Sequence, residues 1–234
     1  MVRQRMSGSQ RREQLITIGR QAFAEKGFEG ISVEEIAARA GVSKPVIYEH
    51  FGGKEGLYAV VVDREMRHLE QLITESLQQG RSKYRIERAV LALLTYVEDH
   101  TDGFQILSRD VTPTGERSYA TMLVDAVEQV SYILAKAFVN AGLDPNTATL
   151  YGQALVGMVS MTAQWWLEAR EPAKEVVAAH IVNLCWNGLA GMEKEPSLLS
   201  TEDKEAESNS FHAHHRAGQN EDSSVEEGMS DGAN

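Results

Sequence analysis

The spacing of apolar side chains is the feature that most constrains the fold of this chain. Between residues 11 and 192, large apolar residues recur every three or four positions, which is the repeat of a helix that buries one face. No segment alternates apolar and polar residues as a half-buried strand would. We therefore predict an all-α fold in which three short helices precede six further helical stretches. The short helices are expected near residues 11–26, 33–40 and 45–48, and the others over 54–79, 83–99, 103–109, 116–141, 145–169 and 173–192.

Composition excludes several classes of protein. The 234 residues are 42% hydrophobic and 24% charged, which suits one large or two modest globular domains and rules out a wholly disordered or collagen-like chain. No apolar run reaches the ~18 residues of a membrane span, and the N-terminus lacks the apolar stretch of a signal peptide. Cys185 is the only cysteine and cannot form an intrachain disulfide. We expect a cytoplasmic protein without a membrane partner.

Charge is distributed unevenly along the chain. The net charge of −11 by itself argues against a nucleic-acid partner. However, residues 1–55 carry nine Lys and Arg against seven Asp and Glu, whereas residues 193–234 carry three against eleven. The excess of acid therefore lies mainly at the C-terminal end. The N-terminal region, in which four arginines precede the first acidic residue, remains compatible with DNA binding.

Residues 32–54 have the pattern of a helix-turn-helix. Ser32 and Glu35 have the spacing of a capping box, in which each side chain accepts a backbone N–H of the other residue. The pair Gly41-Val42 ends this first helix, and Pro45 falls in the first turn of the next, where its missing N–H is harmless. A second helix held at this angle can enter the major groove of DNA. An ordinary corner between two helices of a bundle is the alternative interpretation of the spacing alone.

The residues themselves favour the DNA-binding interpretation. From about residue 12 to residue 60 the chain closely resembles the DNA-binding domain of the tetracycline-repressor (TetR) family. The resemblance is carried by Ser32, Ile36-Ala37, Ala40-Gly41-Val42-Ser43, Ile47-Tyr48, His50-Phe51 and Lys54-Glu55. Pro45-Val46 departs from the Gly-Thr of many relatives and leaves few hydrogen-bonding side chains to contact bases, so we expect DNA shape to contribute to specificity.

The resemblance implies specific DNA contacts. Ser32 would bind a phosphate through its hydroxyl and the helix N-terminus, and Lys44 would reach a guanine edge or a phosphate. Pro45 and Val46 offer apolar contacts only. The expected DNA-binding residues are Arg11, Arg12, Ser32, Ser43, Lys44, Pro45, Val46, Tyr48, His50 and Lys54. For Tyr48, a partly buried packing role is nearly as well supported as a phosphate contact.

The resemblance also implies that the longer helices bind a small effector and form a homodimer. Aromatic residues and methionines on these helices could line an apolar pocket, although each could equally belong to the core. The expected pocket residues are Tyr96, His100, Phe104, Tyr119, Met122, Tyr132, Met158, Met161, Trp165 and Trp166. We place the dimer interface on residues 145–169 and 173–192, because 151–161 are apolar nearly all round and need two burial partners.

The expected domains follow from these patterns. Residues 1–10 form a basic flexible arm, 11–55 a helix-turn-helix DNA-binding domain and 56–192 a helical bundle for ligand binding and dimerisation. Residues 193–234 are acidic, with few large apolar side chains, and are expected to be a disordered tail. His212, His214 and His215 lie in that tail without a further ligand or a rigid frame, so we predict no metal site and no cofactor.

The predicted function is therefore a ligand-responsive transcriptional regulator. A dimer would bind a near-palindromic operator with its two recognition helices one turn apart, ~34–36 Å. Repression, relieved by a small apolar or aromatic effector, is the commonest outcome that the resemblance implies, and activation is also compatible with it. The alternatives are a helical small-molecule carrier or an enzyme without DNA binding. Against an enzyme, the sequence contains no Gly-rich phosphate loop, zinc-protease motif or nucleophile elbow.

Overall fold

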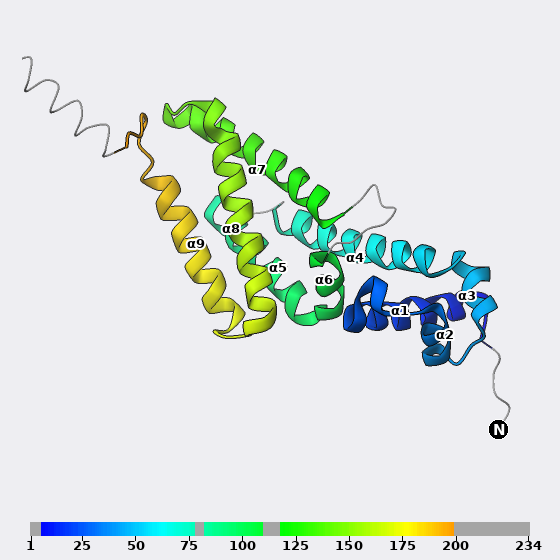
Figure 1. Ribbon diagram of the computed structural model, residues 1–234. Helices are drawn as coiled ribbons and strands as arrows, with labels where there is room; N and C mark the ends of the chain where they lie inside the picture. Colours follow the sequence, from blue (N-terminus) through cyan, green and yellow to red (C-terminus); the bar gives the residue numbers. More distant parts are fainter. Residues whose placement is uncertain (1–5, 78–81, 110–117, 199–234) are drawn as a thin grey trace, which may run out of the picture. The chain divides into compact units, whose positions relative to one another are not determined.

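The computed structural model describes residues 6–77, 82–109 and 118–198. Every regular element within these ranges is a helix, so the predicted all-α class is confirmed (Figure 1). The described residues up to Gly191 belong to one compact unit, which contains all the elements described below, and a second unit begins at Met192. None of the described helices combines the length and the apolar composition that crossing a bilayer requires.

The first three helices pack around a small shared core. α1 spans Gly8–Gly30, α2 spans Val33–Ala40 and α3 spans Lys44–Phe51. Gly41 and Gly52 end α2 and α3 in the left-handed region, with φ of 62° and 76°, a conformation that favours glycine. The core side chains of this cluster, none more than 1% exposed, are Leu15, Phe23, Ile36 and Ile47.

The start of α1 differs from the sequence prediction. The helix begins at Gly8 rather than near residue 11, because Ser7 and Gln10 form a complete capping box that satisfies the first backbone donors. The last residues of the predicted flexible arm are therefore helical. Gly27, at a φ of 73°, interrupts the helix where the sequence predicted its end, and one further turn continues to Gly30.

α4 spans Lys54–Leu77 and carries the chain from the first three helices into the rest of the unit. Its first turn lies against the end of α3 so closely that a Cβ atom at Gly56 would lie 1.8 Å from the backbone oxygen of Phe51. Gly19 of α1 makes room in the same way for Leu57, whose side chain is fully buried. These two glycines set the position of α4 against α1 and α3.

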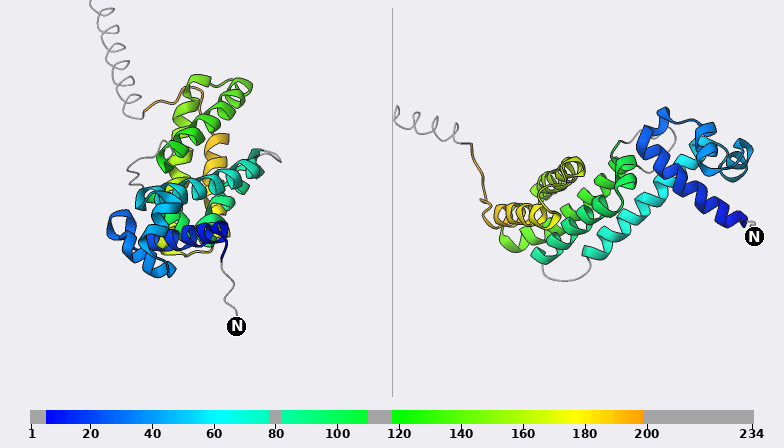
Figure 2. Two further views of the ribbon diagram at one scale, coloured as in Figure 1. Left: turned by 90° about the vertical axis from the view of Figure 1, so that its right-hand side faces the viewer. Right: turned by 90° about the horizontal axis from the view of Figure 1, so that it is seen from below.

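The remaining helices form a bundle around α4 and α5. They are α5 (Ser82–Asp99), α6 (Thr101–Ser108), α7 (Tyr119–Ala141), the 3₁₀ turn η1 (Pro145–Thr147), α8 (Ala148–Ala169) and α9 (Lys174–Ala190). α5 packs on α4 and α9, α6 packs on α1, and α7 packs on α8 (Figure 2). The predicted stretches 83–99, 103–109 and 173–192 correspond closely to α5, α6 and α9.

The contact between α7 and α8 is close because Gly152 has no side chain. A Cβ atom there would lie 2.4 Å from the Ser131 Oγ of α7. The sequence predicts two burial partners for this stretch, its own bundle and a second subunit, and Gly152 packs within the bundle. The other glycine of that stretch, Gly157, has no atom within 4 Å of a Cβ built on it.

Gly56→Ala should destabilise the protein, because the added methyl group meets backbone rather than a movable side chain. We expect a loss of about 1–3 kcal/mol in the free energy of unfolding, the usual range for overpacking. Gly188→Ala is the matched control, since a Cβ atom there meets nothing within 4 Å. Chemical denaturation of both variants measures the difference; equal stability would contradict the proposed tight joint between α3 and α4.

Candidate nucleic-acid interface and ligand cavity

α2 and α3 form a helix-turn-helix with one face exposed. Ile47 is fully buried, and Val46 packs from one side against the same core. The opposite face of α3 presents Ser43, Lys44, Pro45 and Tyr48 to solvent, as the sequence predicted; the ring of Tyr48 is 48% exposed. Tyr48 is therefore accessible to a DNA phosphate, while about half of its surface is covered by the protein.

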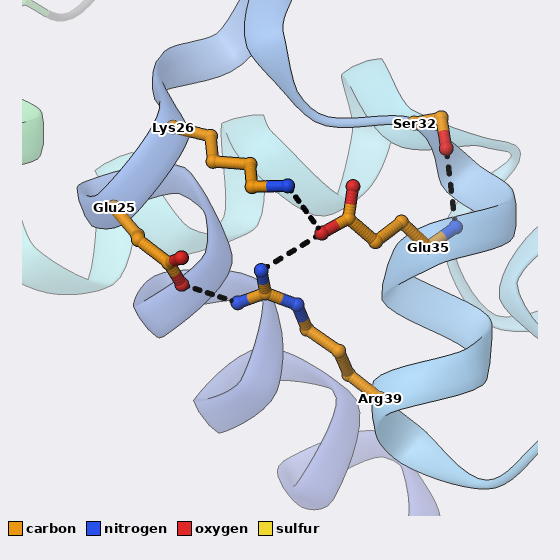
Figure 3. Close-up of polar contacts among 5 residues, drawn as sticks. All are labelled: Glu25, Lys26, Ser32, Glu35 and Arg39. Carbon is orange, nitrogen blue, oxygen red and sulfur yellow. Dashed lines mark hydrogen bonds and ion pairs between the residues drawn. The ribbon is translucent and has the colours of Figure 1, made fainter.

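The N-terminus of α2 is held by a single cap and an ion-pair network. The Glu35 backbone N–H donates to Ser32 Oγ at 3.1 Å, as predicted. The second half of the predicted capping box is not formed. Instead, the Glu35 carboxylate accepts from Lys26 at 2.7 Å and from Arg39 at 2.8 Å, and Arg39 also donates to Glu25 at 2.6 Å (Figure 3). Two cations compete successfully for this carboxylate, and the network ties α2 to the end of α1.

Lys44 is paired within the free protein. Its ammonium lies 2.5 Å from a carboxylate oxygen of Glu34 and 5.7 Å from the centre of the Tyr48 ring. The hydrogen bond with Glu34 raises the pKa of Lys44, and the same bond lowers the pKa of Glu34. Both side chains are exposed, so the pair is easily exchanged for another partner.

The other side chains predicted to contact DNA differ in how strongly they are engaged by partners within the protein. Arg11 donates to Gln14 at 2.6 Å, and the Arg12 guanidinium lies 4.7 Å from the centre of the Phe51 ring. His50 is half-buried beside Phe51. Lys54 is the most constrained, because its ammonium donates to the Phe28 carbonyl at 2.9 Å and lies 4.2 Å from the Phe28 ring. In the free protein, Lys54 holds the last turn of α1 against α4.

An apolar cavity of about 420 Å³ lies between α4, α5, α7 and α8. This volume is within the usual range for a small-molecule site. Aliphatic side chains dominate its wall, including Leu69, Ile73, Val90, Leu93, Met122 and Val159. Tyr119 is the aromatic residue of the wall, and burial raises its pKa to about 12, an effect that Gln164 partly opposes, so the hydroxyl stays protonated at neutral pH. Cys185 also lines the cavity, and burial raises the pKa of its thiol.

Of the predicted pocket residues, Tyr119 and Met122 line this cavity and the others lie elsewhere. Tyr96 and Phe104 are buried in the core around α5 and α6, and Met158 packs against that core. Trp166 is 1% exposed, and its indole N–H donates to the Pro172 carbonyl at 2.8 Å. The side chains of Tyr132, Met161 and Trp165 are more than half exposed, and His100 lies at the corner between α5 and α6. Aromatic character was a poor guide to this cavity, because aliphatic residues form most of its wall.

Comparisons with known proteins agree with this arrangement. Residues 15–61 match the family described as bacterial regulatory proteins, tetR family, and residues 83–198 match the tetracyclin repressor-like, C-terminal domain. The first match covers the helix-turn-helix and the start of α4, and the second covers α5 to α9.

Individual relatives extend the similarity. The HTH-type transcriptional activator FasR of Mycolicibacterium smegmatis is 27% identical over 188 residues, which are 80% of this chain and 86% of that protein. The transcriptional repressor NemR of Escherichia coli K12 is 34% identical over 74 residues, 32% of this chain and 37% of NemR. A TetR-like transcriptional regulator from Rhodococcus sp. RHA1 superposes with a TM-score of 0.65 at 24% identity, over 80% of this chain and 100% of that one. The chain therefore belongs to the TetR family of DNA-binding transcriptional regulators.

Proposed function

We propose that the protein is a homodimeric repressor that binds a near-palindromic operator and is released by a small apolar effector. The observation that carries the proposal is the exposed face of α3, which presents Ser43, Lys44 and Tyr48 beside a capped α2. The similarity to the activator FasR favours activation as the second candidate. In vitro transcription from a promoter that contains the operator separates the two, because repression lowers the transcript level and activation raises it.

The roles proposed for the individual contacts follow from their exposure. Lys44 reads a base edge or a phosphate, while Tyr48 and the N-terminus of α2 at Ser32 hold the DNA backbone. Arg11 and Arg12 lie against the phosphates, and His50 takes a supporting contact. Lys54 contributes mainly by fixing the last turn of α1. A regulator of this kind acts on chromosomal DNA in the cytoplasm.

The cavity is the proposed effector site. Its aliphatic wall suits an apolar molecule, and the protonated Tyr119 hydroxyl can donate a hydrogen bond to an oxygen of that molecule. Leu69 and Ile73 of α4 belong to this wall, and α4 continues to the helix-turn-helix. An effector that favours a shifted α4 moves each recognition helix away from its half-site. The effect on operator affinity is limited to the difference in effector affinity between the two states.

The proposed dimer interface lies on α8 and α9. Large apolar side chains remain exposed there, including Leu150, Met161 and Trp165 on α8 and Val176 and Leu184 on α9. Exposed apolar surface of this kind is typical of a protein–protein interface. A twofold axis through these helices would place two recognition helices on one operator.

Lys44→Ala should weaken operator binding and lower its salt dependence. If Lys44 binds a phosphate, the slope of log affinity against log salt should decrease by about one. If it binds a guanine edge, the free energy that distinguishes guanine from other bases at one operator position, about 1–3 kcal/mol, should be lost, and discrimination at the other positions should be unchanged. Fluorescence anisotropy with operator variants at several salt concentrations measures both quantities. An unchanged affinity would contradict a role for Lys44 in DNA binding.

Glu34→Gln is the complementary variant. It removes the carboxylate that pairs with Lys44 at 2.5 Å in the free protein, together with a negative charge near the DNA. We expect tighter operator binding at low salt and a smaller gain at high salt, because charge interactions at exposed sites are screened. In the Lys44→Ala background the same substitution should have a smaller effect, and equal effects in both backgrounds would show that the pair does not compete with DNA.

Ala126→Phe should fill part of the cavity, because Ala126 lies in its wall. Titration with 1-anilinonaphthalene-8-sulfonate, an anionic dye whose aromatic rings bind apolar surfaces, should then show affinity reduced about tenfold, equivalent to ~1.4 kcal/mol. Ala120→Phe is the control, since Ala120 is exposed on the same helix and outside the cavity wall. Equal loss in the two variants would mean that the dye binds elsewhere.

Leu184→Glu should dissociate the dimer. Leu184 is 61% exposed in one chain, and a carboxylate at that position would be buried without a partner in the proposed interface. Sedimentation should show a monomer at concentrations where the unaltered chain is dimeric, with operator affinity lost in parallel. Tyr84→Glu, at an exposed apolar residue of α5, should remain dimeric.

A further inference from the structure

A group of potential metal ligands lies at the corner where α4 meets the end of α5 and the start of α6. Glu65 and His68 are three residues apart on α4 and therefore share one face of that helix. His100 is the residue between α5 and α6. One potential ligand atom from each of Glu65, His68 and His100 lies within 4.8 Å of the other two.

The Glu65 carboxylate is held in place from two sides. It is 4% exposed, and the Tyr96 hydroxyl donates to its Oε2 at 2.8 Å. Burial, followed by the charge of Glu65, raises the pKa of Tyr96, so this hydroxyl remains a donor at neutral pH. Gly103 of α6 leaves room for the carboxylate, because a Cβ atom there would lie 2.1 Å from Oε2. Carboxylate ligands of metals are commonly oriented by such an outer hydrogen bond.

The two imidazoles face each other without polar partners. Their ring centres are 4.4 Å apart and nearly perpendicular. No hydrogen bond among the described residues uses a ring nitrogen of His68 or His100. A ring nitrogen of each imidazole is therefore available as a ligand atom. Both rings are half-buried, which leaves a path from solvent.

We propose that Glu65, His68 and His100 bind a divalent transition-metal ion of the zinc type. Two imidazole nitrogens and one carboxylate oxygen are a ligand set that such ions accept, with a fourth position left for water. A tetrahedral site needs ligand atoms about 3.4 Å apart, given metal–ligand bonds of about 2.1 Å. In the structure the ligand atoms are up to 4.8 Å apart. Rotation of the two partly exposed imidazoles would shorten these distances to the value that a metal requires.

The position of the site gives metal binding a structural consequence. The metal would join α4 to the corner of α5 and α6. It would also compete with Arg20 of α1, whose guanidinium makes only a long 3.4 Å contact with the other Glu65 oxygen, Oε1. The Arg20 Nε atom is buried and has no hydrogen-bond partner among the described residues. The contact between α1 and α4 is therefore the one that the metal would change.

Cobalt(II) binding to the full-length, tag-free chain tests the proposal. His212, His214 and His215 are first replaced by Ala, because three nearby histidines could bind Co²⁺ by themselves. We expect one equivalent of Co²⁺ to bind with the visible absorption of a low-symmetry nitrogen and oxygen site. In this background, His68→Asn and His100→Asn should each reduce affinity by at least the 10–100-fold that loss of an outer-shell partner alone produces.

A control variant and a measurement of folding accompany the two site variants. His180→Asn, at an exposed histidine on the α9 face proposed for the dimer interface, should bind Co²⁺ as the background does, and sedimentation checks that this variant is still dimeric. Far-UV circular dichroism without metal establishes that each variant is folded, and the two histidine variants test the site independently. A second readout is the midpoint of thermal unfolding, which Zn²⁺ should raise in the background protein and not in His100→Asn. Full Co²⁺ affinity in folded His68→Asn or His100→Asn, or no bound Co²⁺ in the background, would overturn the proposal.

Discussion

The structure depends on the packing of one continuous helix, α4, against α1 and α3. At its start, the absence of a side chain at Gly56 lets the helix lie on the Phe51 carbonyl, and Leu57 fills the space opposite Gly19. Two turns further on, Glu65 meets Tyr96 of α5. Near its end, Leu69 and Ile73 line the cavity. A rotation or shift of this helix would therefore change the position of the helix-turn-helix, the contacts of the Glu65 carboxylate and the shape of the cavity together.

Much of the fold could be predicted from the sequence because its signals are local. Apolar spacing located the helices to within a few residues, and Gly41, Pro45 and Ser32 defined the helix-turn-helix by their own backbone preferences. Local sequence patterns did not predict the hydrogen-bond partner of a side chain that more than one donor can reach. The Glu35 carboxylate has the spacing of a capping box, but Lys26 and Arg39 approach it from two helices and offer charge-assisted bonds.

The cavity and the buried Glu65 carboxylate depend on contacts between residues far apart in the sequence. The spacing of residues along the chain does not specify such contacts. Adjacent residues illustrate this limit. The sequence indicates that Trp165 and Trp166, as neighbours on one helix, point in different directions, but not which of them is buried; Trp165 is exposed on α8, and Trp166 is buried with its indole N–H hydrogen-bonded to the Pro172 carbonyl. Similarly, Glu65 looks like an ordinary surface acid in a mixed helix, and only the approach of α5 and α6 encloses it. His100 was expected to face an effector, whereas the fold places it beside His68.

The same geometry would allow the proposed effector site and the proposed DNA-binding face to be coupled without a contact between them. The lining of the cavity includes one end of α4, whereas the other end of α4 abuts α3. Because both ends belong to one hydrogen-bonded helix, a change in its preferred position at the cavity cannot be absorbed by local bending at low cost. The long contact between Arg20 of α1 and Glu65 lies between these two ends of α4. A second ligand that binds at Glu65 would therefore act on the coupling between the two sites rather than on either site directly.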